Sequence, residues 1–429
     1  MELKNFNKLS LVTSISAKAL SAIGVIIFQL LLTRLNNEES LGHFSAILSV
    51  LFFIGVLARW GSAELLFKDG QSVEMSNGKR HRNIFIFHIM RNTLFRAILL
   101  TILLASVNFF LLPLLGLNQL IKTEYYYLWF VAPLFALTSI NANYLYLLNK
   151  NFIAGLSEPG GVAFLSSLLL VLVVVADTDF DSHLPFLIYG LVLFSISVIP
   201  IIALGIITRL AKKNNNQPLF QTQLLQSSIF VYLGQWGTIA VIAAVKPPAI
   251  VGIFAVCLQL SVFLDFFMRV AGSVYSHQIR YAYENMPLKD FAKQIQRISR
   301  AVALASTAVF IILLSCAEII FELFGFSDER FYFIFMVLII ARFTNNLFGL
   351  TDAFLIMTNY QREYKWIIIV SSSIALGGAF MSPFVKIEIV ASMIALTIIL
   401  RNILSSIVIY KKSGLLMIPL FVRVNKQFN

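Results

Sequence analysis

The chain has 429 residues, of which 59% are hydrophobic and only 13% charged, and its mean hydropathy is +0.84. Soluble domains usually hold about 45–50% apolar and about 25% charged residues, so this composition excludes an ordinary soluble protein. The formal net charge of +12 does not indicate a nucleic-acid-binding protein, because the basic residues fall in short stretches between apolar runs rather than in one block.

Apolar runs of about twenty residues, the length needed to cross about 30 Å of hydrocarbon, recur along the chain. The first of them, 10–34, is too long for the apolar region of a signal peptide and is interpreted as a retained span. Because a lipid-facing backbone must satisfy its own hydrogen bonds, the spans are expected to be α-helices. The sequence predicts an all-α integral membrane protein of about twelve transmembrane helices, at 10–34, 43–66, 93–116, 124–148, 160–178, 185–209, 224–245, 249–275, 299–322, 331–357, 364–384 and 388–410.

Lysine and arginine are distributed unevenly between the segments that connect these spans. The segments on one side of the predicted bilayer hold 22 of them, and those on the other side hold 5, namely Arg34, Lys122, Lys246, Arg330 and Lys386. Basic loops are retained in the cytoplasm, so the richer side is predicted to be cytoplasmic, with both termini on it. The expected location is the bacterial inner membrane.

The spans also divide into two predicted lobes of six helices each. The N-terminal lobe covers 1–210, a polar cytoplasmic linker covers 211–223, the C-terminal lobe covers 224–410, and a cytoplasmic tail covers 411–429. In each lobe the longest cytoplasmic loop is expected after the second span, at Lys68–Asn92 and Ser276–Arg300. This correspondence favours an internal duplication, as in transporters built from parallel repeats.

Ionisable residues inside the spans are the candidate functional residues, because each costs about 2.5–3.5 kcal/mol at the centre of a membrane helix. Several lie at steps of three and four residues, which place polar groups on one helix face. In span ten this stripe contains Arg342, Asn345, Gly349 and Asp352. The candidates for a buried polar cavity are Lys18, Arg59, Arg269, Arg342, Arg401 and Asn345, and the candidates for ion coupling are Asp265, Asp352 and Glu64.

Structural interpretations of some of these charges stay open at this point. Asp265 and Arg269 are four residues apart and can form a pair within one helix. Glu64 and Arg96 lie near the ends of their spans and can extend to the interface. The cations nevertheless outnumber the carboxylates, and guanidinium groups bind phosphate through paired hydrogen bonds. The sequence therefore predicts an anionic cargo, with phosphate as its expected charged group.

Signatures of enzymatic chemistry are not found in the sequence. It contains no G-x-x-x-x-G-K-[ST] loop for nucleotide phosphates and no H-E-x-x-H motif. The cysteines and histidines have no metal-ligand spacing, so neither a metal nor a cofactor is expected. The interpretation is a non-enzymatic membrane protein; a membrane-bound polysaccharide polymerase is a weaker alternative, because it would need a large outer loop with reactive groups.

Four short stretches resemble those of a known transporter family. They are the stretch Leu30–Leu35 followed by Glu38–Ser45, the stretch Trp60–Leu66, the group Gly234-Gln235-Trp236-Gly237, and Ile250–Ala255. With the span count and orientation, they are similar to the polysaccharide-transport branch of the multidrug/oligosaccharidyl-lipid/polysaccharide exporter superfamily, specifically the bacterial O-antigen flippases.

The resemblance implies a MATE-like fold and a flippase activity. Such a protein would move an undecaprenyl-pyrophosphate-linked oligosaccharide from the cytoplasmic to the periplasmic leaflet by alternating access, with ion coupling. Its partners would be this glycan substrate, membrane lipid and other polysaccharide-assembly proteins. The alternative is a cation-coupled exporter of small molecules or drugs from the same superfamily.

Overall fold

The structure is a computed structural model of the chain. It describes residues 8–117, 120–148, 150–176, 182–208, 222–326, 328–358, 360–418 and 420–424. Within these ranges the side chains are described except at 8–12, 14, 63–81, 123, 203–208, 222–224, 273–274, 276–278, 280–281 and 423–424.

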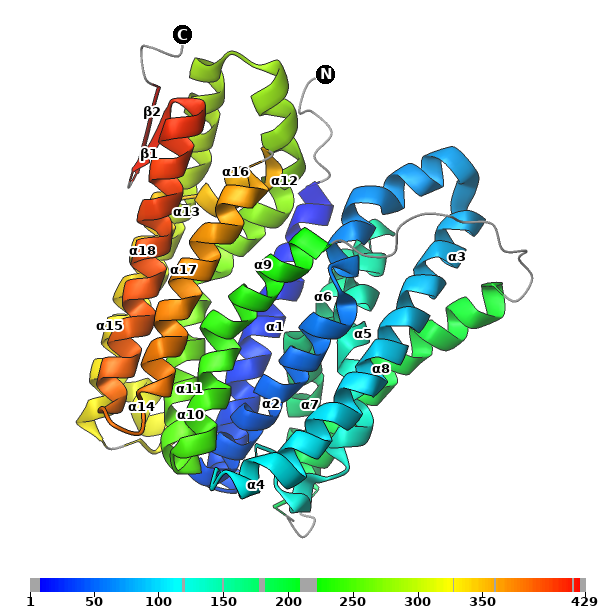
Figure 1. Cartoon of the computed structure of the whole chain (residues 1–429), viewed down its shortest axis with the longest axis vertical. Helices are drawn as coiled ribbons and strands as arrows, with labels where there is room; N and C mark the ends of the chain where they lie inside the picture. The colour runs from blue at the N-terminus through cyan, green and yellow to red at the C-terminus, as the bar shows by residue number, and fades with distance from the viewer. Residues whose placement is uncertain are drawn as a thin grey trace. The chain divides into compact units, whose positions relative to one another are not determined.

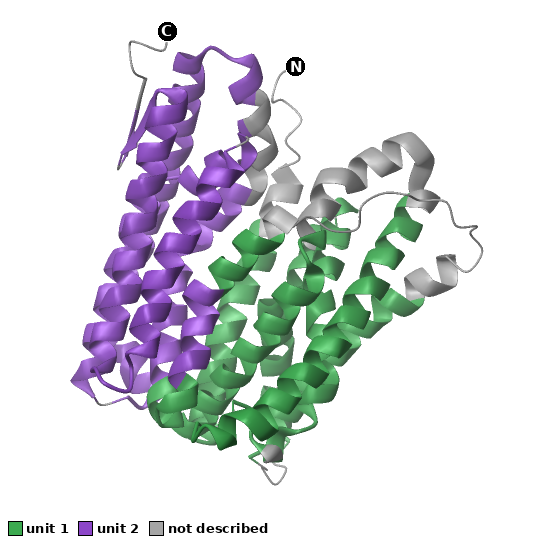
Figure 2. Ribbon diagram, in the orientation of Figure 1, with its two compact units in different colours: residues 1–232, 243–252 green, residues 233–242, 253–429 purple. Residues whose placement is uncertain are grey.

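The chain forms two compact units, which Figure 2 distinguishes by colour. Unit 1 contains residues 1–232 and 243–252, and unit 2 contains residues 233–242 and 253–429. The predicted linker at 211–223 falls almost entirely outside the described residues, so the lobe boundaries drawn from the sequence stay a prediction.

Unit 1 is built from α-helices with short irregular helical segments between them (Figure 1). They are α1 (Lys8–Leu35), α2 (Glu38–Arg59), α3 (Ser62–Ser106), the π-helical η2 (Val107–Leu111), α4 (Leu112–Leu114), the 3-10 helix η3 (Thr123–Tyr125), α5 (Leu128–Leu147), α6 (Asn151–Ser157), α7 (Pro159–Val175), α8 (Leu184–Thr208) and α9 (Thr222–Tyr232).

Unit 2 is also helical, and a short antiparallel hairpin ends its described part (Figure 1). Two of its helices, α10 (Thr238–Val245) and α11 (Pro248–Val262), have an end in unit 1. The others are the π-helical η4 (Leu233–Gly237), the 3-10 helix η5 (Phe263–Asp265), α12 (Phe266–Asn285), α13 (Leu288–Ser315), α14 (Ala317–Phe324), α15 (Glu329–Phe348), α16 (Thr351–Met357), α17 (Gln361–Phe380) and α18 (Ile387–Ser413), followed by strands β1 (Leu415–Ile418) and β2 (Phe421–Val424).

The predicted all-α membrane architecture is confirmed. Ten helical stretches in the described part are long and apolar enough to cross a membrane, or eleven if the bent pair α6–α7 is counted as one span. The sequence predicts about twelve. Large apolar side chains are also widely exposed, among them Phe110 (76%), Leu114 (81%), Phe130 (77%) and Phe384 (87%). A soluble monomer rarely exposes so much apolar surface, whereas lipid covers it in a membrane protein.

Two of the expected connections differ from the prediction. Segment 68–92, predicted as a loop, lies inside α3, and segment 276–300 contains the end of α12 and the beginning of α13. The end of an apolar run does not mark the end of a helix. A helix that leaves the hydrocarbon can continue in water, because its backbone hydrogen bonds are made within the helix.

Several predicted spans are interrupted rather than continuous. Predicted span 331–357 is divided into α15 and α16, 249–275 contains the 3-10 turn η5, and 224–245 contains the π-helical segment η4. At the first break Gly349 has φ +75° and ψ −149°, a conformation that only glycine adopts readily. A Cβ at Gly349 would also collide with the Ser299 side chain of α13.

In unit 1, α1 packs most extensively against α7 and α6. Small residues permit this close approach: a Cβ added to Gly24 would overlap the backbone of Phe164, and one added to Gly155 would overlap Ala17. The Ser21 hydroxyl donates to the Gly155 carbonyl at 2.8 Å. The same region contains the 79° bend between α6 and α7, so the bend is held against α1 by close packing.

In unit 2, the hairpin β1–β2 packs against α18, α13 and α15. The backbone N–H of Leu420 donates to the carbonyl of Leu347 at 3.0 Å, near the end of α15. The Arg300 side chain donates to the carbonyl of Leu420 at 3.2 Å and lies 5.4 Å from the centre of the Phe421 ring. The hairpin therefore covers the end of α15 next to its break at Gly349.

Candidate functional site

Unit 2 contains six of the nine site residues predicted from the sequence, and five of them belong to one hydrogen-bonded network. The five come from η5, α15, α16 and α18, and they are Asp265, Arg342, Asn345, Asp352 and Arg401. Lys18, Arg59 and Glu64 belong to unit 1. The grouping of all five predicted cations into one seam therefore stays a prediction.

A buried ion pair lies at the centre of this network. Arg342 Nη1 donates to Asp265 Oδ2 at 2.6 Å, and the two side chains are 3% and 9% exposed. Asp265 occupies the N-cap position of α12, yet its carboxylate makes no capping bond to that helix. The carboxylate bonds α15 instead, so the pair joins the α11–α12 connection to α15.

Asparagine amides extend the network from this pair to α18. Asn345 donates through Nδ2 to Asp265 Oδ1 at 3.2 Å, and its Oδ1 accepts from Asn402 Nδ2 at 2.8 Å and from Arg401 Nη2 at 3.5 Å. Asn346 donates to the carbonyl of Leu264 at 2.7 Å. Thr351 Oγ1 donates to Asn402 Oδ1 at 3.3 Å. The two donor hydrogens and the acceptor of an amide allow Asn345 to join an anion to other donors.

A second ion pair lies at the α16 end of the network. Arg401 Nη2 is 3.5 Å from Asp352 Oδ2, and the two side chains are 17% and 32% exposed. Among the described residues, Arg401 Nε and Asp352 Oδ1 have no hydrogen-bond partner, although both atoms are buried. Compared with the pair of Arg342 and Asp265, this pair is longer and more exposed, and one of its two carboxylate oxygens has no partner among the described residues.

Arg269 lies outside this hydrogen-bonded network. Its side chain is exposed on α12, and the structure records no ion pair between it and Asp265. Of the two interpretations left open by the sequence, the intrahelical pair is therefore wrong, since the Asp265 carboxylate bonds Arg342 and Asn345.

The three predicted site residues of unit 1 lie in different local settings. The ammonium of Lys18 is 6.0 Å from the centre of the Tyr146 ring. Arg59, at the end of α2, donates through Nε to the carbonyl of Gly55 at 2.7 Å. Glu64 lies in α3, and its side chain is outside the described residues.

Sequence reasoning missed a carboxylate in unit 1 and an amide in unit 2. Tyr146 OH donates to Glu158 Oε1 at 2.9 Å, and Glu158 occupies the bend between α6 and α7. The available signal was the sequence Glu158-Pro159-Gly160, since proline favours the first turn of a helix. Asn402 follows Arg401 directly and is 1% exposed, and a carboxamide so deep in a predicted span was the signal for it.

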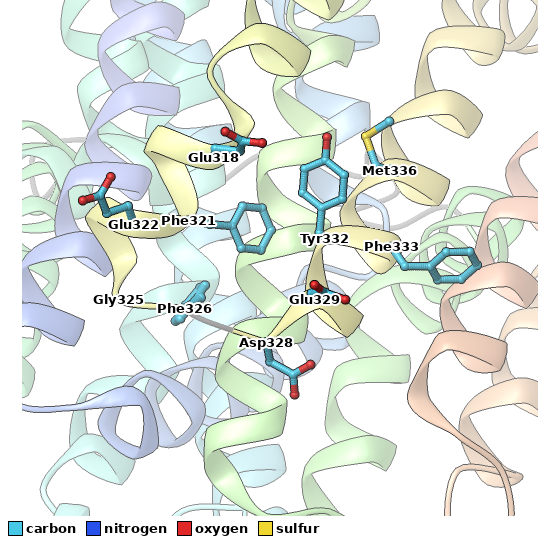
Figure 3. Close-up of a pocket in the computed structure, with 10 residues that line it drawn as sticks. All are labelled: Glu318, Phe321, Glu322, Gly325, Phe326, Asp328, Glu329, Tyr332, Phe333 and Met336. Carbon is cyan, nitrogen blue, oxygen red and sulfur yellow. The ribbon is translucent and has the colours of Figure 1, made fainter.

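A pocket of about 820 Å³ lies between α14 and α15 in unit 2, apart from the charged network (Figure 3). Its lining combines four carboxylates with aromatic rings and a methionine: Glu318, Phe321, Glu322, Gly325, Phe326, Asp328, Glu329, Tyr332, Phe333 and Met336. The rings of Phe321 and Tyr332 lie 6.1 Å apart. Within the described residues, no group of three or more His, Cys, Asp or Glu side chains is arranged to hold a metal ion.

Asp328 of this pocket is the N-cap of α15. Its Oδ1 accepts from the backbone N–H of Arg330 at 2.9 Å, and its carboxylate also accepts from the Arg330 guanidinium, with Nε at 2.8 Å from Oδ2. The guanidinium and then the backbone N–H hold the pKa of the Asp328 carboxyl below its usual value of 3.8. One of the four carboxylates is thereby already neutralised by a neighbour.

Comparison with known proteins identifies the fold. No family model matches the sequence, and no curated protein matches it either. Among solved structures, a ligand complex of the MATE multidrug transporter DinF-BH is similar over 96% of both chains, with a TM-score of 0.61 and 13% identity. The outward-facing conformation of a multidrug resistance MATE family transporter of the MOP superfamily is similar over 93% of both chains, with a TM-score of 0.51 and 12% identity. The chain therefore has the multi-pass membrane fold of MATE-type transporters.

Proposed function

We propose that this protein is a flippase for an undecaprenyl-pyrophosphate-linked oligosaccharide, the O-antigen repeat unit. It moves this lipid from the cytoplasmic to the periplasmic leaflet of the bacterial inner membrane by alternating access, coupled to an ion. Its termini are on the cytoplasmic side, and it acts beside other polysaccharide-assembly proteins. The MATE-type fold supports membrane transport, and the chemistry of the charged network supports the choice of cargo.

The observation that carries the proposal is the balance of charge among the predicted site residues of unit 2. Three of them are arginines, Arg269, Arg342 and Arg401, and two are carboxylates, Asp265 and Asp352. Arg269 is exposed on α12, outside the hydrogen-bonded network. A transporter for cations is expected to show the opposite balance, because opposite charges stabilise a ligand in a low dielectric. Guanidinium groups match the paired oxygens of a phosphate, so a pyrophosphate lipid is the cargo that this balance favours.

Deleting the gene in its own bacterium tests the function. We expect loss of the surface polysaccharide and accumulation of the lipid-linked oligosaccharide in the inner membrane, both restored by the wild-type gene. Arg401→Ala should fail to restore the polysaccharide, whereas Arg330→Ala should restore it, because Arg330 is a 64% exposed cation at the pocket end of α15. Unchanged surface polysaccharide after deletion would contradict the proposal.

Export of cationic drugs is a second candidate function, favoured by a different observation. Carboxylates and aromatic rings line the pocket between α14 and α15, a composition that attracts organic cations. In addition, the two solved structures compared above are of multidrug transporters. This alternative predicts that the deletion strain becomes more sensitive to lipophilic cations and keeps its polysaccharide, and the same strain distinguishes the two functions.

A further inference from the structure

The two ion pairs of unit 2 differ in contact distance and in the exposure of their side chains, two properties that set how easily a pair separates. The Arg342–Asp265 pair has a 2.6 Å contact and side chains 3% and 9% exposed, whereas the Arg401–Asp352 pair has a 3.5 Å contact and side chains 17% and 32% exposed. Separating an enclosed pair leaves two charges without solvent, and separating a partly exposed pair costs much less. Only the second pair is therefore suited to opening during a transport cycle.

Unused hydrogen-bonding capacity is also present at this second pair. Arg401 Nε and Asp352 Oδ1 are buried and have no partner among the described residues. The two groups touch through one nitrogen and one oxygen, so the paired geometry that guanidinium forms with an oxyanion is not used. Arg342 Nε also lacks a partner, but its side chain is enclosed, and its guanidinium is bonded to Asp265 at 2.6 Å.

Arg401 keeps a second contact if Asp352 moves away. Its Nη2 lies 3.5 Å from Asn345 Oδ1, and Asn345 is bonded in turn to Asp265 and Asn402. The guanidinium is thus supported by the buried asparagines of the network. Asp352 lies in α16, beyond the break at Gly349, and α16 is a separate seven-residue helix.

We propose that Asp352 is an exchangeable counter-ion of Arg401, and that a phosphate-class anion displaces it. In the unliganded protein the carboxylate occupies the place of an anionic ligand and neutralises the arginine. An arriving phosphate group bonds Arg401 through two oxygens, and the Asp352 carboxylate is released toward solvent or toward a coupling proton. The Arg342–Asp265 pair keeps its place throughout and positions the site without touching the anion. This inference rests on the proposed anionic cargo.

The test is the binding of inorganic pyrophosphate to the purified full-length protein in detergent, measured by titration calorimetry. Asp352→Asn removes the competing charge and keeps the side-chain size, so we expect it to lower the dissociation constant about tenfold, equivalent to about 1.4 kcal/mol. Adding Arg401→Ala to this variant should abolish the gain. Asp290→Asn is the matched control: it makes the same change in net charge at a 62% exposed carboxylate in the first turn of α13, outside the network, and its affinity should stay that of the wild type.

The variant Asp265→Asn distinguishes the role of the Arg342–Asp265 pair from that of the Arg401–Asp352 pair. It should lower the thermal unfolding midpoint without strengthening pyrophosphate binding, because Arg342 is enclosed. The proposal is overturned if Asp352→Asn melts like the wild type and binds no more tightly, if Asp290→Asn gains as much affinity, or if no variant binds pyrophosphate. Asp352→Ser provides a second variant, and failure of both to fold also overturns the proposal, since an exchangeable carboxylate is not required for folding.

Failure of the proposed function would look different. If pyrophosphate binding responds as expected while gene deletion leaves the surface polysaccharide intact, the anion site stands and the cargo is another phosphate-bearing molecule. If the polysaccharide is lost on deletion but Asp352→Asn binds pyrophosphate like the wild type, the flippase stands and the counter-ion exchange is wrong.

Discussion

Arg342 and Asp265 form an enclosed ion pair although they are 77 residues apart in the chain. Each depends on the other, because removal of one partner leaves a charge buried without compensation. We predict that Arg342→Ala or Asp265→Ala costs about 3–5 kcal/mol of stability. Thermal or denaturant unfolding of the purified protein in detergent measures this cost. Arg330→Ala removes a 64% exposed guanidinium and should leave the midpoint nearly unchanged; equal effects at the two positions would refute the prediction.

The hydrogen bond between Tyr146 and Glu158 is predicted to stabilise the bend between α6 and α7. The bond joins α5 to the residue at the bend, with the donor and acceptor 2.9 Å apart. A double-mutant cycle of Tyr146→Phe and Glu158→Gln should give a coupling energy of about 1.5 kcal/mol, the lower end for bonds to charged groups. The cycle is needed because each side chain has other neighbours. Additive effects would show that the bond contributes nothing to stability.

Replacing either of two helical glycines by alanine is predicted to change the free energy of unfolding, in opposite directions at the two positions. Gly155 faces α1, where a Cβ would overlap Ala17, whereas a Cβ at Gly377 of α17 meets nothing within 4 Å. Gly155→Ala should destabilise the protein by about 1–3 kcal/mol through overpacking. Gly377→Ala should stabilise it by about 0.5–1 kcal/mol, because alanine loses less backbone entropy in a helix. Unfolding midpoints of the two variants decide the matter, and a loss at Gly377 would contradict the packing seen there.

Acid is predicted to weaken the start of α15 through Asp328. Its pKa is held below the usual 3.8 by the Arg330 side chain and backbone N–H, so the ionised carboxylate favours the folded state. This contribution is present at pH values above 3.8 and is lost as the pH falls through the lowered folded-state pKa. Stability measured between neutral pH and about pH 3 should therefore fall less in Asp328→Asn than in the wild type.

At neutral pH, variants of Asp328 measure how much its helix cap contributes to stability. Asp328→Ala removes the side-chain acceptor for the backbone N–H of Arg330 and should cost about 0.5–2 kcal/mol. Asp328→Asn keeps an acceptor oxygen and should cost less. If Asp328→Ala and Asp328→Asn have the same unfolding midpoint, Asp328 does not stabilise the protein by capping the helix.

Much of the membrane architecture could be predicted from the sequence because the bilayer imposes length and polarity on each helix. Runs such as 185–209 and 388–410 correspond to α8 and α18 within three residues at each end. Interruptions were harder to predict. The break at Gly349 depends on a backbone conformation and on the Ser299 side chain of another helix, and hydropathy contains neither kind of information.

The candidate site could be predicted only as far as single helices allow. The spacing of Arg342, Asn345 and Asp352 placed them on one face, and the structure joins all three to one network. The sequence could not show which residues pair with them. Arg269 is closer to Asp265 in sequence than Arg342 is, yet Asp265 bonds Arg342. Pairing between helices depends on tertiary packing, which is also why Asn402 was missed.

Chain order gives the two ion pairs a further meaning for biosynthesis. Each carboxylate precedes its guanidinium in the chain, so Asp265 is translated before Arg342 and Asp352 before Arg401. An unpaired carboxylate is costly in hydrocarbon, so each helix is expected to remain near the aqueous insertion channel until the later one arrives. The charged network is therefore expected to delay the release of these helices into lipid until α18 has been made, so that they enter the membrane as an assembled group.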